Sequence, residues 1–183
     1  MKQIICTVLT VLLFFCNQLN ASEKNKIIEN LIKINSLQFN FTQISSDGQE
    51  NGSCILIYPK KMRCIYDEQK KEIIINDDYL YLIDKEGNKN YNYSIKDTPL
   101  GVMLDKKSLI EKLSNIEKFN ITNNFIIATV DVSFNERVDI YFEPKNFTIL
   151  GWRIKNYDKS TLEFMMKNII VNINSDEKFQ IPN

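Results

Sequence analysis

Side chains that could perform catalysis are scarce in this chain. None of its 183 residues is histidine, which excludes His-ligated metal sites, Ser-His-Asp and Cys-His catalysis, and imidazole pH switches. Two pairs of adjacent carboxylates, Asp67-Glu68 and Asp77-Asp78, could in principle supply an acid and a base. Neighbouring residues of a strand point to opposite faces and Asp favours turns, so we interpret both pairs as solvated turns. We therefore expect no catalytic residue, no metal site, no cofactor and no enzymatic activity.

Cysteines form the second group with distinctive chemistry. Two of the four lie near the N-terminus, and Cys54 and Cys64 remain if that segment is removed. An even pair in an exported protein suggests a disulfide. The two flank a turn expected at residues 59–60, which would place them nearly opposite each other on antiparallel strands. Two free, buried cysteines are the alternative, whereas a zinc site needs more ligands than this pair supplies.

Residues 1–21 are predicted to form a signal peptide. Lys2 is basic, residues 4–16 are apolar, and cleavage is expected near Ala21-Ser22. The apolar run is short for a bilayer span of about 20 residues, although an uncleaved anchor stays an alternative. We expect residues 22–183 to form one domain. The chain has 23 basic and 23 acidic residues, which argues against nucleic-acid partners and against strong attraction to an anionic membrane.

Hydrophobic periodicity predicts a helix followed by a long series of strands. Ile27, Leu31 and Ile34 recur at helical spacing after a possible cap at Ser22. From Leu37 the period changes to two, and tight turns between strands indicate antiparallel neighbours. About ten or eleven strands are expected, a number at which an antiparallel sheet usually curls. They run from residue 37 to a turn at 45–48, then over 53–58, 62–66, 72–75, 79–84, 90–95, 125–132, 137–142, 148–155, 161–166 and 168–173.

A short apolar helix is predicted between the two groups of strands. Thr98 can cap it, Pro99 suits its first position, and apolar residues follow at 100–104. Ser108 and Glu111 form a capping box that predicts the start of a second helix. A short apolar helix beside a long sheet either plugs one face as core or closes over a cavity as a movable lid. The pattern alone favours neither.

Aromatic side chains make up 11% of the chain and most lie on predicted strands. A wide or unclosed barrel leaves internal space, so this content is compatible with a cavity lined by aromatic rings. Packing in an ordinary core is the simpler interpretation on composition alone.

Several motifs, taken in order, resemble those of the LolA-type outer-membrane lipoprotein carriers. Phe39-Asn40-Phe41-Thr42-Gln43 is similar to the start of the family's sheet, and residues 58–66 (YPKKMRCIY) follow where the family has Arg-Pro and an F-R-W-x-Y-like strand. Residues 76–84 resemble its D-G-x-x-L-W-x-Y-D hairpin, residues 97–100 its T-P-x-x-L-L lid segment, and residues 172–182 its C-terminal ending. The resemblance extends over nearly the whole chain after the signal peptide.

This resemblance implies a fold, a function and a site. The fold is α+β and mainly antiparallel β, an unclosed half-barrel whose helices cover its apolar concave face. The function is a monomeric periplasmic carrier that takes acylated lipoproteins from an inner-membrane ABC transporter to an outer-membrane receptor. The acyl-chain cavity and its lid would comprise Phe39, Phe41, Tyr58, Tyr66, Tyr81, Leu100, Val102, Met103, Leu104 and Trp152.

The chain departs from the family pattern at two positions. Tyr58 replaces the Arg before the proline, and Cys64 replaces the usual Trp. If that Arg ties the lid to the sheet, Tyr58 or Arg63 must take its place, or the lid opens more easily. Two other functions stay open at this point. One is an exported interaction or structural domain without a lipid cavity, and the other is an exported hydrolase with an unfamiliar carboxylate site.

Overall fold

The computed structural model describes residues 23–67, 70–96, 98–133, 136–155, 160–174 and 179. The expected signal peptide and its cleavage site lie outside these residues, as do Asp97 and the ending at 180–183. A helix occupies residues 23–33, and the other two helices are α2 (Pro99–Leu104) and α3 (Lys106–Ser114). The strands are β1 (Ser36–Ser45), β2 (Gly48–Ile57), β3 (Lys61–Tyr66), β4 (Lys71–Asn76), β5 (Tyr79–Asp84), β6 (Lys89–Ser94), β7 (Asn120–Ile121), β8 (Ile126–Ser133), β9 (Glu136–Phe142), β10 (Ile149–Lys155) and β11 (Thr161–Val171).

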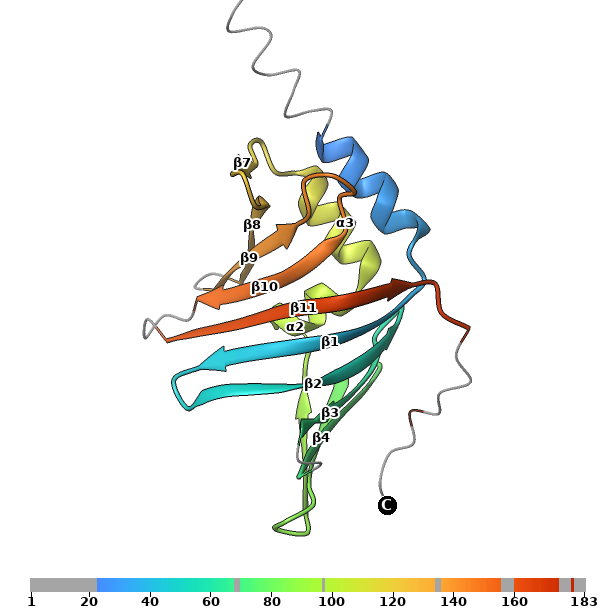
Figure 1. The fold of residues 1–183 in the computed structure, drawn as a ribbon, viewed down its shortest axis with the longest axis vertical. Coiled ribbons are helices and arrows are strands. Elements are labelled where there is room, and N and C mark those ends of the chain that lie inside the picture. Colours follow the sequence, from blue (N-terminus) through green and yellow to red (C-terminus); the bar gives the residue numbers. More distant parts are fainter. Residues whose placement is uncertain are drawn as a thin grey trace, which may run out of the picture.

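All the described strands belong to one antiparallel sheet. Their order is β6-β5-β4-β3-β2-β1-β11-β10-β9-β8-β7, so β6 and β7 are edges and the sheet does not close on itself. Two meanders, β1 to β6 and β7 to β11, are joined where β1 pairs with β11. The sheet curves, and α2 and α3 lie on one side of it (Figure 1). The predicted α+β half-barrel of ten to eleven strands is confirmed.

The concave face of the sheet is apolar because the strands alternate with period two. One row of directly paired residues shows this, since Phe39, Cys54, Cys64, Ile73 and Leu82 face one another in turn across β1 to β5. Cys54 and Cys64 are joined by a disulfide in this row. The row links five strands through apolar contacts and one covalent bond.

The opposite, convex face carries ion pairs. Arg153 Nε lies 2.6 Å from Glu163 Oε2, and Lys155 Nζ lies 2.6 Å from Asp139 Oδ2. On the other half of the sheet Arg63 Nε lies 2.6 Å from Glu72 Oε1. One side of the sheet therefore carries ion pairs, in which Glu72 and Asp139 are themselves buried, and the apolar side faces the helices.

The first helix is held by burial of its apolar side chains, and α3 is held by hydrogen bonds to the end of that helix. Ile27 and Leu31 of the first helix are buried in the core. Lys106 at the start of α3 donates from Nζ to the carbonyl oxygens of Ile32 and Ile34, at 3.3 and 3.0 Å. These bonds fasten α3 to the C-terminal end of the first helix. Within the described ranges, no helix has the length and apolar character needed to cross a membrane.

Two sequence predictions about element ends are wrong. The cap of α3 is Asp105, whose Oδ1 accepts from the backbone N–H of Ser108 at 3.1 Å, so Ser108 lies inside the helix. The strands expected at 161–166 and 168–173 are one strand, β11, which continues past Asn168 at a φ of 53°. The register of β1 against β11 shifts between Gln38 and Asn40 and absorbs this irregularity as a bulge.

Candidate functional site

An apolar cavity of about 280 Å³ lies on the concave face beneath α2. Its wall is built from alternate residues of the strands, which period-two geometry brings to the same face. Leu100 closes it from the side of α2. The lining residues are Gln43, Met62, Cys64, Tyr66, Lys71, Ile73, Leu80, Leu82, Leu100, Trp152, Ile154, Leu162 and Phe164.

Stacked aromatic rings form a continuous wall across four strands. Trp152 stacks on Phe164 with ring centres 4.5 Å apart, and Phe164 stacks on Phe41 at 4.7 Å. Phe41 meets Tyr66 edge-on at 5.0 Å. Gly52 pairs with Phe41, and a Cβ there would lie 2.7 Å from the phenylalanine ring, so this ring occupies the space of the missing side chain. The wall is therefore rigid and apolar.

The predicted site residues are distributed over the cavity, the core and the convex face. Tyr66, Leu100 and Trp152 line the cavity. Phe39 and Phe41 are buried in the core, where both contact the ring of Phe164. Val102, Met103 and Leu104 are buried on α2, where Val102 also lines a groove beside the helix, and Tyr58 is half-buried just after β2.

The prediction for Tyr81 is wrong. Leu80 and Leu82 line the cavity, so Tyr81 between them points to the convex face, opposite Ile74. Tyr81 was expected in the cavity because its side chain is aromatic. The alternation of side chains along β5 between the two faces of the sheet contradicts that expectation. The same alternation would have found Ile73, Leu80 and Leu82, which the sequence reasoning missed.

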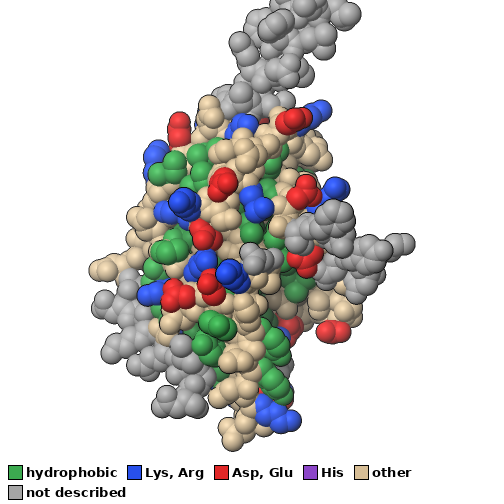
Figure 2. Space-filling model, turned by 180° about the vertical axis from the view of Figure 1, so that it is seen from behind, with side chains coloured by type: hydrophobic (Ala, Val, Ile, Leu, Met, Phe, Trp, Pro, Cys, Tyr) green, Lys and Arg blue, Asp and Glu red, His purple; other side chains and the backbone are tan. Residues whose placement is uncertain are grey.

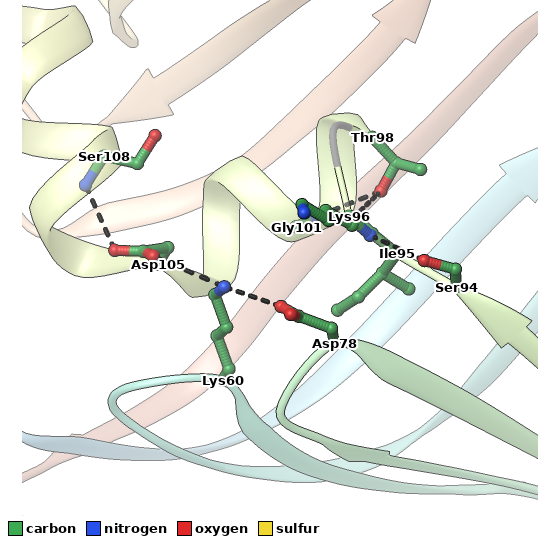
Figure 3. Close-up of polar contacts among 9 residues, drawn as sticks. All are labelled: Lys60, Asp78, Ser94, Ile95, Lys96, Thr98, Gly101, Asp105 and Ser108. Carbon is green, nitrogen blue, oxygen red and sulfur yellow. Dashed lines mark hydrogen bonds and ion pairs between the residues drawn. The ribbon is translucent and has the colours of Figure 1, made fainter.

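The start of α2 is a tight polar turn. The Thr98 hydroxyl donates to the carbonyl of Ile95 at 2.6 Å and accepts from the backbone N–H of Gly101 at 3.1 Å (Figure 3). The predicted cap at Thr98 and the first helical position of Pro99 are confirmed. Gly101 lies so close to the preceding turn that a Cβ would sit 2.1 Å from the oxygen of Ile95.

Lys60 ties the other end of α2 to the sheet. Its backbone N–H donates to the carbonyl of Leu104 at 3.0 Å. Its ammonium lies 2.7 Å from Asp78 Oδ1 and 3.5 Å from Asp105 Oδ2, which places it between the β4–β5 turn and the junction of α2 and α3 (Figure 3). The hydrogen bond between Lys60 and Asp78 raises the pKa of Lys60 and lowers the pKa of Asp78 relative to their ordinary values. We call Lys60, Asp78 and Asp105 the lid tether.

A family model described as outer membrane lipoprotein carrier protein LolA matches residues 32–182 of the chain. The chain belongs to the LolA family. Members of this family are periplasmic or exported carrier and binding proteins for lipoproteins or lipids, rather than enzymes. The resemblance drawn from the motifs is therefore confirmed.

The solved structures to which this LolA-family chain is similar differ widely from it in sequence. A LolA superfamily protein from Nitrosomonas europaea is 7% identical, with 88% of this chain and 97% of that chain covered at a TM-score of 0.48. A putative outer membrane lipoprotein-sorting protein domain from Vibrio parahaemolyticus is 9% identical, with coverages of 88% and 95% and a TM-score of 0.47. The lipoprotein LppX from Mycobacterium tuberculosis is 10% identical, with coverages of 85% and 97% and a TM-score of 0.43. None of the curated proteins matches the sequence significantly.

Arg63 and Tyr58, the two residues expected to replace the family arginine, contact parts of the described structure other than α2. Arg63 faces the convex surface, where it pairs with Glu72. Burial raises the pKa of the Tyr58 phenol, and the ring lies 5.7 Å from Lys106 Nζ, on α3 rather than α2. Lys60 makes the polar contacts with the lid instead, a role that the sequence reasoning missed because it assigned this lysine to a turn only.

Proposed function

We propose that this LolA-family protein is a periplasmic carrier that shields the acyl chains of lipoproteins in the cavity beneath α2. It would receive them from an inner-membrane ABC transporter and release them to an outer-membrane receptor. The observation that carries the proposal is an apolar cavity with a rigid aromatic wall on one side and the apolar residue Leu100 of a short, separately tethered helix on the other.

The volume of the cavity supports a lid that moves. About 280 Å³ lies just below the roughly 300–1,000 Å³ of pockets that enclose small-molecule ligands. A long acyl chain therefore needs more space than the empty form offers. Displacement of Leu100 and its neighbours on α2 would extend the apolar surface, because Met103 and Leu104 cover the same core.

Incomplete burial of the acyl chains also suits a carrier that must release its cargo. Burial of each methylene contributes about 0.8 kcal/mol, so complete burial of several long chains would exceed any affinity that permits release. A cavity that α2 fills when empty reduces the net gain, since acyl chains must displace apolar side chains that are already packed. The lid tether is partly exposed, with side-chain exposures of 27% for Lys60 and 31% for Asp105, and ion pairs of this kind are weak enough to open and close.

The cysteine chemistry agrees with export. A disulfide between Cys54 and Cys64 forms and persists in an oxidising compartment such as the periplasm. Together with the predicted signal peptide, this supports the proposed location.

A fluorescence assay tests the cavity. A neutral naphthylamine probe should bind saturably and be displaced by acylated peptide, and Leu100→Asp should weaken probe binding by at least about tenfold, since an unpaired carboxylate would enter the apolar wall. Ile170→Asp is the matched control, because Ile170 is 55% exposed on β11 and the same change there should leave binding unaltered.

A purified protein that binds neither probe nor acylated peptide would exclude the carrier function. It would instead favour an interaction domain in which α2 is fixed core. Turnover of a substrate that disappears on replacement of one carboxylate would favour the hydrolase.

A further inference from the structure

Four polar residues form a row across the concave face at one end of the cavity. They are Gln43 on β1, Glu50 on β2, Tyr66 on β3 and Lys71 on β4, and we call them the polar row. Gln43, Tyr66 and Lys71 line the apolar cavity. Glu50, Tyr66 and Lys71 also line a second, polar pocket. The polar row therefore separates an apolar space from a polar one.

Hydrogen bonds within the polar row fix its members. Tyr66 donates from its hydroxyl to Gln43 Oε1 at 3.1 Å, and Gln43 Nε2 donates to Glu50 Oε2 at 3.1 Å. Lys71 Nζ donates to Glu50 Oε1 and lies 4.0 Å from the centre of the Tyr66 ring. Burial raises the pKa of the Tyr66 phenol, so its hydroxyl stays protonated. The geometry is that of a preorganised polar site.

The polar row has no net charge, since Glu50 balances Lys71. The adjoining pocket adds one charge of each sign, from Asp67 and Lys70. A carboxylate or phosphate entering here would lose water without meeting an uncompensated cation, which is unfavourable. An ester or amide carbonyl requires only a hydrogen-bond donor. Lys71 carries three N–H groups and the Gln43 amide two, more than the bonds within the row use.

We infer that the polar row holds the uncharged ester or amide group of an acylated cargo and discriminates against ionised fatty acids and anionic lipids. This inference rests on the proposed function, because it requires an acyl chain in the cavity. Acyl chains attached to a protein are linked through such uncharged groups. The polar row thus favours binding of lipoprotein cargo over binding of ionised lipids with the same hydrocarbon chain.

Competition between two amphiphiles of equal chain length tests the inference. Monomyristoyl glycerol and myristate are each titrated against the neutral naphthylamine probe at pH 8, where the carboxylate is ionised. The glycerol ester should displace the probe at a concentration at least about tenfold lower than myristate, a difference of about 1.4 kcal/mol in binding free energy. Equal inhibition constants would overturn the inference while leaving the proposed function intact.

Two substitutions should move this ratio in opposite directions. Glu50→Gln leaves Lys71 unbalanced and should bring myristate to at least equal potency with the ester. Lys71→Gln leaves Glu50 unbalanced and should weaken myristate further. Asp131→Asn is the matched control, because Asp131 is 74% exposed and pairs with Arg137 away from the cavity; its ratio should equal that of the wild type.

The outcomes separate the two proposals. A ratio unaffected by both substitutions, in variants with native urea-unfolding curves, would overturn the assignment of the polar row. A wild-type protein that binds no probe would refute the proposed function and the inference with it.

Discussion

Replacement of Gly101 by alanine sets two physical effects against each other. Alanine in a helix is favoured over glycine by up to about 1 kcal/mol, so helix propensity alone predicts a more stable α2. The added Cβ, however, would lie 2.1 Å from the backbone oxygen of Ile95, and the two atoms must separate by 0.9 Å to reach 3.0 Å. The obstructing atom belongs to the backbone, which cannot rotate away. The helix start must therefore shift.

The magnitudes decide the outcome. A shift at this point disrupts the bond from Gly101 N–H to the Thr98 hydroxyl, and loss of such a cap costs about 1 kcal/mol. Overpacking costs about 1–3 kcal/mol more. After subtraction of the propensity gain, docking of α2 should weaken by about 1–3 kcal/mol. If α2 is a lid that competes with acyl chains, probe affinity should rise by about fivefold to 150-fold, since each 1.4 kcal/mol is a factor of ten.

Two measurements check this prediction together. Amide hydrogen exchange at residues 99–104 should accelerate in Gly101→Ala, and the dissociation constant of the naphthylamine probe should fall. Gly87→Ala is the matched control, because the atom nearest to its Cβ is the end of the flexible Asp84 side chain. Unchanged exchange would refute the steric argument, and faster exchange with weaker probe binding would refute the competition between α2 and cargo.

The remaining predictions concern the lid tether and the disulfide. Lys60→Met should accelerate exchange in α2 near neutral pH. The pKa of Lys60 is raised and the pKa of Asp78 is lowered, so both groups are charged and the tether is intact between their ordinary pKa values of 10.5 and 3.8. The tether is lost when the pH falls through the lowered pKa of Asp78 or rises through the raised pKa of Lys60. The exchange rates of the wild type and the variant should therefore converge in acid, and a constant difference at every pH would contradict this. Reduction of the Cys54–Cys64 disulfide, which spans a sequence separation of 10, should lower the free energy of unfolding by about 2–4 kcal/mol in urea titrations, and two free thiols in protein exported to the periplasm would refute its formation there.

Much of the fold could be predicted from the sequence because its signals are local. The switch from helical spacing at Ile27 and Leu31 to alternation from Leu37, the short turns, and the Thr98-Pro99 helix start each depend on neighbouring residues only. The cap of α3 was misassigned because Asp105 and Ser108 are both good capping residues three positions apart. The continuity of β11 depends on its pairing with β1, more than 100 positions away along the chain, where one extra residue of β11 is accommodated between Ile170 and Lys167; no local pattern records this pairing.

The site was harder to predict than the fold because it is assembled across strands. The wall depends on which face each residue occupies, and Tyr81 shows that aromatic character is a poor guide when alternation points the other way. The lid tether joins two turns and the junction of α2 and α3, which are distant in sequence. Lys60 and Asp78 each look like solvated turn residues until the sheet brings them within 2.7 Å of each other.

The combination of a packed lid and a short cavity bears on how a carrier can release what it binds. Burial of one side chain such as Leu100 contributes about 1.5–3 kcal/mol, which two to four methylenes at about 0.8 kcal/mol each offset. Each lid side chain that is displaced therefore cancels the gain from two to four carbon atoms of the incoming chain, and Met103 and Leu104 of α2 are buried as well. The net affinity is a small difference between two similar apolar contacts, so modest interactions of a donor or an acceptor protein with the lid are enough to shift it. A rigid aromatic wall and a weakly tethered helix together provide this balance, whereas a deep, permanently open cavity would not.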